Sequence, residues 1–273
     1  MRRFDGLRIG GMLAAILAAI VAASAQSTRV APPPPPTSPD AAEAARVLEA
    51  ATAALGGPKY LAVTSQVSTG VFTAFVQGQR GAPVDFIDTF VYPDRNRTEF
   101  GKKKSRVVQT NVGDSGWKFD AQRDMLAAQT SEEVALFKRY IRANLDNVLR
   151  GLWRSPDAQL EYLGKAELSP RQWSDRVALT YGDGLRVELF FDAQTHLPTL
   201  TKYFEGAESG APGAVLETRY FFFLDYGGVK SPRTVDLYRD NVQTARVVYD
   251  SVIFNSAVDA RVFEKPATSK DLK

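Results

Sequence analysis

Residues 214–255 constrain the fold more than any other part of this chain. Their sequence, AVLETRYFFFLDYGGVKSPRTVDLYRDNVQTARVVYDSVIFN, contains three strand patterns, at 216–226, 229–239 and 242–254. Gly227 and Gly228 separate the first two, and Asp240-Asn241 supplies a tight turn because short Asx side chains tolerate positive φ. Three long strands joined by short turns predict an antiparallel meander. No catalytic motif interrupts it, so function is to be sought on the surfaces of a large sheet.

The first 25 residues have the pattern of a secretory signal peptide. Arg2, Arg3 and Arg8 precede an apolar stretch at 9–23, and Ala23-Ser24-Ala25 is a small-x-small cleavage pattern. The alternative, an uncleaved membrane anchor, needs about 20 predominantly apolar residues, and this stretch is shorter. We therefore expect cleavage after Ala25, a periplasmic or otherwise exported protein that is soluble after cleavage, and no integral membrane span in the mature chain.

The charge of the mature chain argues against nucleic acid as a partner. The full chain has 34 basic and 31 acidic residues, and the leader holds three Arg and one Asp. Cleavage leaves 31 basic and 30 acidic residues, whereas a nucleic-acid-binding protein keeps a concentrated basic surface. The one local basic cluster, at Lys102, Lys103, Lys104 and Arg106, is typical of a solvated turn, and the alternative is a partner site. The chain has no cysteine, so it forms no disulfide and carries no cysteine-linked lipid.

A proline-rich linker follows the leader at residues 26–39. Its five consecutive prolines, 32–36, predict an extended polyproline II spacer, with a recognition ligand as the less frequent meaning. Residues 40–273 are long enough for a single β-rich domain with one core.

Two amphipathic helices are predicted in this domain. In the first, 40–55, apolar residues recur at three- and four-residue spacing before Gly56 and Gly57 end the helix. The second, 131–149, begins at Ser131 with acidic residues in its first turn, where the helix dipole favours them. Each helix is apolar on one side only, so we expect both to lie against the sheet.

Strand patterns fill most of the remaining domain. They precede the meander at 216–254 and lie at 60–68, 71–77, 84–92, 96–100, 106–112, 116–119, 159–168, 176–181, 185–191 and 197–205. Asp88 interrupts the apolar face of 84–92. Almost all connections are local, so the predicted class is α+β, mainly β: a strongly curved antiparallel sheet, an open half-barrel of about eleven strands, with helices covering its concave side.

Two phrases of the sequence have the form of known family motifs. Residues 190–204 read FFDAQTHLPTLTKYF, and residues 252–266 read VIFNSAVDARVFEKP. Together with the leader, the helix ending ALGGPKY and the alternating strands, they resemble the LolA-like superfamily, which includes periplasmic lipoprotein carriers and related exported lipid-binding proteins. The resemblance spans most of residues 40–266.

Individual positions carry this resemblance. The family's Asp-x-x-Thr-x-Leu-Pro turn, which joins two central strands, matches Asp192, Thr195, Leu197 and Pro198. Its frequent ending, an Asp followed by Phe-Glu-x-Pro, matches Asp259, Phe263, Glu264 and Pro266. The resemblance implies a half-barrel with helices over its mouth and an apolar cavity between them, in which the family's carriers hold acyl chains. A fold alone does not fix a function.

We expect such a cavity to be lined by aromatic and branched side chains on one face of the sheet, because each methylene removed from water contributes about 0.8 kcal/mol. Plain core packing under the helices is the alternative for each residue, since apolar periodicity reports burial first. The candidates are Phe86, Phe90, Trp117, Phe119, Leu189, Phe191, Tyr220, Phe222, Val247 and Tyr249.

The sequence offers no enzyme signature. The single histidine, His196, lies in the Asp192–Pro198 turn, and nothing nearby supplies the partners that a catalytic histidine needs, so we interpret it as surface variation. There is no cysteine and no Gly-x-Ser-x-Gly motif to provide a nucleophile. We expect no catalytic residue, no metal site and no cofactor.

Two functional hypotheses follow. The first is an exported envelope protein that binds a lipid or the acyl chain of a lipoprotein non-covalently in the cavity, with a role in lipid or lipoprotein transport. The alternative is a periplasmic protein-interaction, sensor or scaffold module of the same fold, with a filled core and an envelope protein as its partner. An exported hydrolase has little support.

Overall fold

The computed structural model describes residues 39–205 and 213–272. The predicted signal peptide and the proline run lie outside these residues. The strands, in chain order, are β1 (Ser65–Val76), β2 (Gln79–Arg80), β3 (Val84–Val91), β4 (Arg95–Phe100), β5 (Val107–Val112), β6 (Ser115–Asp120), β7 (Met125–Ala128), β8 (Ala158–Ser169), β9 (Gln172–Tyr181), β10 (Arg186–Asp192), β11 (Pro198–Glu205), β12 (Ala214–Asp225), β13 (Lys230–Arg239) and β14 (Val242–Phe254). The helices are α2 (Pro39–Leu55), α3 (Pro58–Leu61), α4 (Ser131–Ala143) and α5 (Leu145–Leu149), with short 3-10 helices η1 (Lys103–Ser105), η2 (Leu152–Arg154), η4 (Ala260–Phe263) and η5 (Ser269–Leu272).

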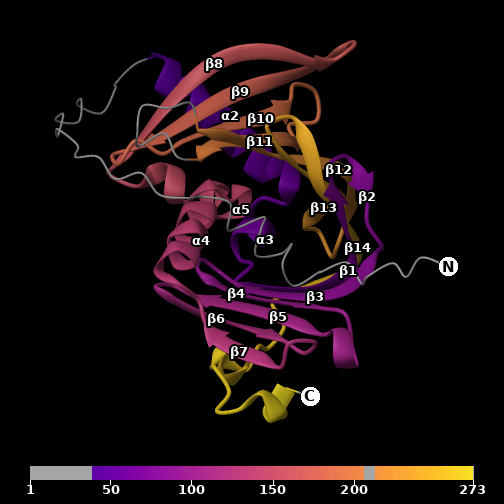
Figure 1. The fold of residues 1–273 in the computed structure, drawn as a ribbon. Coiled ribbons are helices and arrows are strands. Elements are labelled where there is room, and N and C mark those ends of the chain that lie inside the picture. Colours follow the sequence, from indigo (N-terminus) through magenta and orange to yellow (C-terminus); the bar gives the residue numbers. More distant parts are fainter. Residues whose placement is uncertain (1–38, 206–212, 273) are drawn as a thin grey trace.

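One antiparallel sheet contains all fourteen strands of the described residues. Its order is β7-β6-β5-β4-β3-β1-β14-β13-β12-β11-β10-β9-β8, and β2 pairs only with β1. Pairing between β1 and β14 joins the two ends of the domain's sequence, and β7 and β8 remain as the two edges (Figure 1). The sheet curls around the helices without closing. The predicted class, a mainly β fold with a curved half-open sheet, is therefore confirmed, with fourteen strands rather than about eleven.

The strand prediction was wrong at the start of the sheet. Instead of two strands at 60–68 and 71–77, the chain forms α3 and then one long strand, β1. Gly70 is the site of a register shift between β1 and β14, not of a turn. A Cβ at Gly70 would lie 2.1 Å from the carbonyl oxygen of Val248, so only glycine permits this close approach of the two strands.

Helix α2 confirms the predicted amphipathic helix almost residue for residue. Its apolar side, which includes Ala44, Leu48 and Ala51, is fully buried in the main core. The helix ends at Gly56, which has a φ of 131° and whose Cβ would lie 2.4 Å from the carbonyl oxygen of Gly228. The helix end and the β12–β13 turn can approach this closely because Gly56 has no side chain.

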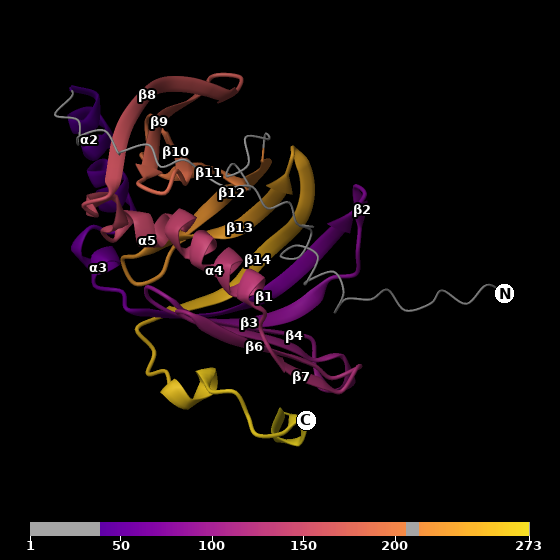
Figure 2. The same ribbon diagram turned by 60° about the vertical axis from the view of Figure 1, so that its left-hand side comes forward.

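The second predicted helix, 131–149, is divided in two. Asn144 ends α4 with extended backbone, and its side chain then caps α5 by accepting a hydrogen bond from the amide of Asn147 (3.2 Å). The N-cap of α4 is Thr130 rather than Ser131, and Thr130 forms a capping box with Glu133. The break lets α4 and α5 run in different directions across the open side of the sheet (Figure 2).

The convex face of the sheet carries a second, smaller core. Val108, Trp117 and Phe119 on β5 and β6 are covered there by the C-terminal segment, whose Leu272 is also buried. The indole Nε1 of Trp117 donates to the carbonyl oxygen of Phe263 (2.8 Å). The C-terminal residues thus act as a cover for strands β4 to β6. Among the helices of the described residues, none has the length and apolar character that crossing a membrane requires.

Candidate binding cavity

A cavity of about 440 Å³ lies between the concave face of the sheet and helix α4. Strands from both halves of the sheet line it, because the curvature brings β3–β5 and β12–β14 round to face the same helix (Figures 1 and 2). Its volume falls in the range of small-molecule and cofactor sites, about 300–1,000 Å³.

Aromatic rings form one wall of this cavity. The rings of Phe86 and Tyr249 meet edge to face with centres 5.7 Å apart, and those of Phe72 and Phe100 meet in the same way at 5.2 Å. Phe86 and Tyr249 sit on different neighbours of β1, and both pair with Gly70 across the ladder. Because Gly70 has no side chain, the two rings approach each other over it, so one glycine shapes this wall.

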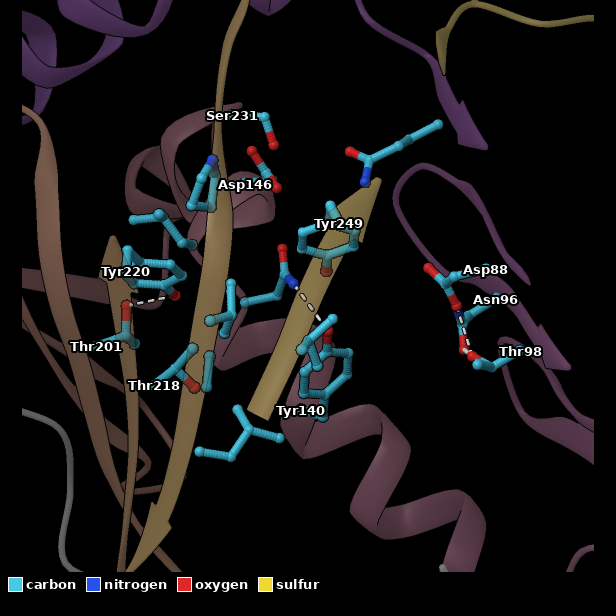
Figure 3. A pocket seen from close by; sticks show the side chains of 18 of the residues that line it. Asp88, Asn96, Thr98, Tyr140, Asp146, Thr201, Thr218, Tyr220, Ser231 and Tyr249 are labelled. Carbon is cyan, nitrogen blue, oxygen red and sulfur yellow. Dashed lines mark hydrogen bonds between the residues drawn. The ribbon is translucent and has the colours of Figure 1, made fainter. Parts of the chain in front are cut away.

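Apolar side chains from β12, β13, β14 and α4 complete the lining. Val235 and Val247 pair across β13 and β14, and Leu136 and Phe137 contribute from the inner side of α4. Tyr220 adds a polar atom, since its hydroxyl lies 3.1 Å from that of Thr201 (Figure 3). Burial raises the pKa of Tyr220, so this hydroxyl is neutral.

A strip of polar side chains crosses the cavity wall on β3, β4 and β5. We call it the polar strip. It comprises Asp88, Asn96, Thr98, Gln109 and Asn111. The ladder places Asp88 opposite Thr98, and Asn96 opposite Asn111. Oδ1 of Asp88 accepts hydrogen bonds from Asn96 Nδ2 (2.9 Å) and Thr98 Oγ1 (2.5 Å) (Figure 3). Burial raises the pKa of the Asp88 carboxyl above its usual value.

Tyr140 of α4 faces the same space as this strip. Its hydroxyl accepts a hydrogen bond from Asn144 Nδ2 (3.1 Å), and in Figure 3 it lies close to Tyr249. The Tyr140 residue is 43% exposed, and desolvation of its hydroxyl first, and then the charge on Asp88, raise its pKa to about 12. The same two causes raise the pKa of Tyr249. The charge on Asp88 therefore acts on both tyrosines, and their hydroxyl groups remain neutral at physiological pH.

Asp146 of α5 lies at the cavity floor. Its carboxylate accepts hydrogen bonds from the hydroxyls of Tyr60 (2.6 Å) and Tyr92 (3.2 Å). Burial first, and then the charge on Asp146, raise the pKa values of both tyrosines. Unlike Asp88, Asp146 therefore has both oxygens engaged by the protein.

Four of the ten predicted side chains line the cavity: Phe86, Tyr220, Val247 and Tyr249. The other six lie elsewhere. Phe90 is buried against Tyr92, with ring centres 4.8 Å apart. Leu189 and Phe191 belong to the main core that α2 covers. Both are inward-facing, as expected, but the helix fills the space above them.

Trp117, Phe119 and Phe222 point away from the cavity. Strand alternation places Trp117 and Phe119 on the convex side, in the core beneath the C-terminal segment. Phe222 has a φ of 55°, which breaks the alternation of β12 and leaves its side chain 74% exposed. Alternation distinguishes the two faces of a strand but does not say which face is concave.

The sequence reasoning missed the polar side chains of the cavity. Only Asp88 gave a signal, as the single charge on an otherwise apolar strand face. Asn96, Thr98, Gln109 and Asn111 lie on strands with polar residues on one face, a pattern typical of ordinary solvated strands. Tyr140 and Asp146 come from the helical region, where the apolar stripe dominated the interpretation.

The described residues contain no cluster suited to a metal ion, and the single histidine lies in a turn. Residues 39–205 and 213–272 contain no cluster of three or more His, Cys, Asp or Glu side chains suited to a metal ion. The carboxylate of Asp192, four residues before His196, accepts hydrogen bonds from the amides of Thr195 (2.7 Å) and Gln194 (3.1 Å). It therefore shapes the β10–β11 turn, and His196 is exposed in that turn with a φ of 57°.

Solved structures with the same fold include a LolA superfamily protein and a domain described as a lipoprotein-sorting protein. A LolA superfamily protein from Nitrosomonas europaea has a TM-score of 0.53 and 12% identity, covering 81% of this chain and 97% of its own. A DUF1329 family protein from Desulfovibrio piger has a TM-score of 0.55 and 10% identity, with 81% and 97% covered. A domain described as an outer membrane lipoprotein-sorting protein, from Vibrio parahaemolyticus, has a TM-score of 0.54 and 9% identity, with 83% and 98% covered.

These similarities establish a LolA-like fold for this chain, as the resemblance in the sequence predicted. At identities of 9–12% they show the fold alone. No protein-family model matches the sequence, and no curated protein matches it.

Proposed function

We propose that the cavity binds the acyl chain of a lipid or of an acylated protein non-covalently, and that the protein does so in the bacterial cell envelope after export. The observation that carries this proposal is the cavity of about 440 Å³ between the sheet and α4, with its aromatic and aliphatic walls. The proposal assigns binding to the site and no chemical reaction. Transport of the bound lipid is part of the same proposal.

The energetics support an apolar ligand. Ten methylenes transferred from water into the cavity contribute roughly 8 kcal/mol. Association costs at least about 4 kcal/mol in lost translational and rotational freedom. The difference is enough for measurable, reversible binding, which suits a carrier that must also release its ligand.

The alternative, an interaction or sensor module with a filled core, fits the cavity less well. Well-packed cores have few voids larger than a water molecule, so a space of this size does not match a filled core. An envelope protein remains a partner under either hypothesis, because an acylated protein would present both its acyl chain and its surface.

The test uses mature protein, residues 26–273. Organic extraction followed by mass spectrometry is expected to reveal co-purified lipid, and a fluorescent fatty acid is expected to bind saturably. Val247 faces the cavity, whereas its neighbour Val248 lies on the opposite face of β14. We therefore expect Val247→Trp to displace the probe, because the indole takes up cavity volume, and Val248→Trp to bind it as the unmodified protein does.

Two results would decide against the proposal. One is an extract without lipid together with no saturable binding of the probe. The other is saturable binding that Val247→Trp and Val248→Trp reduce equally, which would place the probe outside the cavity. A folded state for both variants is checked by circular dichroism, where a sheet-dominated spectrum is expected.

A further inference from the structure

The carboxylate of Asp88 uses only one of its oxygens within the protein. Both of its hydrogen bonds, from Asn96 and Thr98, end on Oδ1. Oδ2 accepts no hydrogen bond from the described residues, although a carboxylate oxygen has two acceptor sites. Asp88 also lines the cavity. An acceptor therefore faces the space that a ligand would fill.

The charge of Asp88 is also uncompensated. Within residues 39–205 and 213–272, no Lys or Arg forms an ion pair with it, and desolvation is the leading influence on its pKa. Asp88 is partly buried, and partial burial of a carboxylate is costly because lost hydration is not offset by an opposite charge. A cationic ligand in the cavity would supply that missing charge.

Asn111 provides a second observation at the other end of the polar strip. It is 3% exposed and lines the cavity, and its buried Oδ1 has no hydrogen-bond partner. Asn111 is on β5, two strands from Asp88 and offset by two residues along the strands, so the Cα atoms of the two residues are roughly 12 Å apart given the usual strand geometry. The polar strip therefore has one unpaired acceptor at each end, Oδ2 of Asp88 and Oδ1 of Asn111. A ligand with hydrogen-bond donors could pair with them.

Aromatic rings surround the Asp88 end of the strip. Phe86 lies two residues away on the same face of β3, in edge-to-face contact with Tyr249. Tyr140 and Tyr249 feel the Asp88 charge, as their raised pKa values indicate. A carboxylate among aromatic faces is a chemistry suited to an ammonium group, which gains from the ion pair and from the rings.

We propose that the polar strip is a subsite for the polar end of an amphiphile that carries a primary ammonium group. The ammonium pairs with Oδ2 of Asp88 beside Phe86 and Tyr249, and the acyl chain extends toward the apolar walls of β12–β14 and α4. This inference rests on the proposed function, because it names the class of amphiphile that the same cavity selects. Arg139 and Lys230 also line the cavity, so a preference for anions is the competing result.

The experiment compares four ligands with the same twelve-carbon chain, each below its critical micelle concentration. Dodecylamine supplies charge and N–H donors, dodecyltrimethylammonium supplies charge alone, dodecanol supplies a neutral donor, and dodecanoate carries the opposite charge. Calorimetric titration of the mature protein is expected to give dodecylamine an affinity about tenfold or more above each of the others, since a charge-assisted hydrogen bond contributes about 1.5–3 kcal/mol.

Asp88→Asn is expected to abolish this preference. The matched control is Asp85→Asn, because Asp85 is on the same strand but is exposed and paired with Lys102. It should keep the preference. A further variant, Asn111→Asp, adds a second carboxylate to the polar strip. It should tighten dodecylamine binding and weaken dodecanoate binding. This variant tests the subsite even if Asp88→Asn fails to fold.

The outcomes separate this inference from the proposed function. Equal affinities for the four ligands, or tighter binding of dodecanoate, would overturn the ammonium subsite and leave acyl-chain binding intact. The subsite is equally refuted if the dodecylamine preference survives Asp88→Asn. If none of the four ligands binds saturably, the proposed function itself fails.

Discussion

Arg150 and Tyr60 are joined in two ways at the floor of the cavity. The guanidinium Nη1 of Arg150 donates to the carbonyl oxygen of Tyr60, and its Cζ lies 4.3 Å from the centre of the Tyr60 ring. The same Nη1 donates to the carbonyl oxygen of Val63 (2.9 Å), and the guanidinium also lies 4.4 Å from the Tyr92 ring. Arg150 thereby holds α3, the end of α5 and the start of β1 together.

Replacing Arg150 by Met is expected to lower the free energy of unfolding by about 2–4 kcal/mol. Two main-chain carbonyls lose their donor, and two tyrosine rings lose a stacked cation. Urea unfolding followed by circular dichroism measures the change. Arg154→Met is the control: Arg154 is exposed and its contact with Glu49 is a surface pair at 3.5 Å, so a change below about 0.5 kcal/mol is expected. Equal effects of the two substitutions would contradict the joining role of Arg150.

Much of the fold could be predicted from the sequence because short-range patterns of apolar, turn and capping residues determine most of its elements. Helix α2 has both an apolar stripe and a glycine stop, and the three strands of 214–255 are separated by Gly227, Gly228 and Asp240-Asn241. The structure places β12, β13 and β14 side by side in sequence order, as a meander requires. These elements are fixed by short-range chemistry, so a reading of neighbouring residues finds them.

The candidate site was less predictable, because it depends on which face of each strand is concave. Trp117 and Val247 are both large apolar residues on strands of this sheet, but only Val247 faces the helices. Trp117 is covered by a C-terminal segment about 146 residues away in sequence. Likewise, Asn144 divides the second predicted helix by capping α5. A single Asn within an amphipathic pattern is not enough to predict such a break.

The ion pair between Arg142 and Asp183 predicts a pH-dependent stability. Two hydrogen bonds (2.6 and 2.8 Å) join the end of α4 to the β9–β10 turn, and hydrogen bonding to Arg142 lowers the pKa of Asp183 to about 2. A depressed carboxyl pKa contributes stability above the unfolded pKa of 3.8, and this contribution is lost as the pH falls toward 2.

Asp183→Asn is therefore expected to be less stable than the unmodified protein at pH 7, and the difference should vanish by about pH 2. Both side chains are partly exposed, so solvent screening keeps the difference below about 1 kcal/mol. Urea unfolding at pH 7, 3 and 2 checks this, with Arg142→Met and the double variant completing a cycle. A pH-independent difference would show that the pair's charge is not its source.

Removing residues 260–273 is expected to expose the second core on the convex face. Trp117 would lose both its hydrogen bond to Phe263 and its cover, so its fluorescence emission should shift to longer wavelength. Trp173 is half exposed, so Trp173→Phe in both forms removes a background signal. The point variant Phe263→Ala should destabilise the protein by about 3–5 kcal/mol, because it opens a cavity at a buried aromatic. An unshifted emission spectrum in the truncated form would contradict the covering role.

Asp88 is expected to destabilise the free protein at neutral pH. Burial raises its pKa in the folded state, so the folded protein holds a proton that the unfolded chain releases more readily. The free energy of unfolding therefore falls as the pH rises from the unfolded pKa of 3.8 to the raised folded value, and stays lower above it. Asp88→Asn removes this loss, and its Oδ1 can still accept from Asn96 and Thr98.

Accordingly, Asp88→Asn should be more stable than the unmodified protein at pH 7 and no more stable at pH 3, as measured by urea unfolding. Asp85→Asn, on the exposed face of the same strand, should show no such pH-dependent gain. Dodecylamine at saturating concentration should narrow the gap at pH 7, because it binds the protein that has the carboxylate more tightly than the variant and therefore stabilises that protein more. If Asp88→Asn is instead less stable than the unmodified protein at pH 7, the Asp88 carboxylate stabilises the ligand-free fold, which would contradict the prediction. A carboxylate that costs stability until a cation arrives is the expected behaviour of a side chain placed for a ligand.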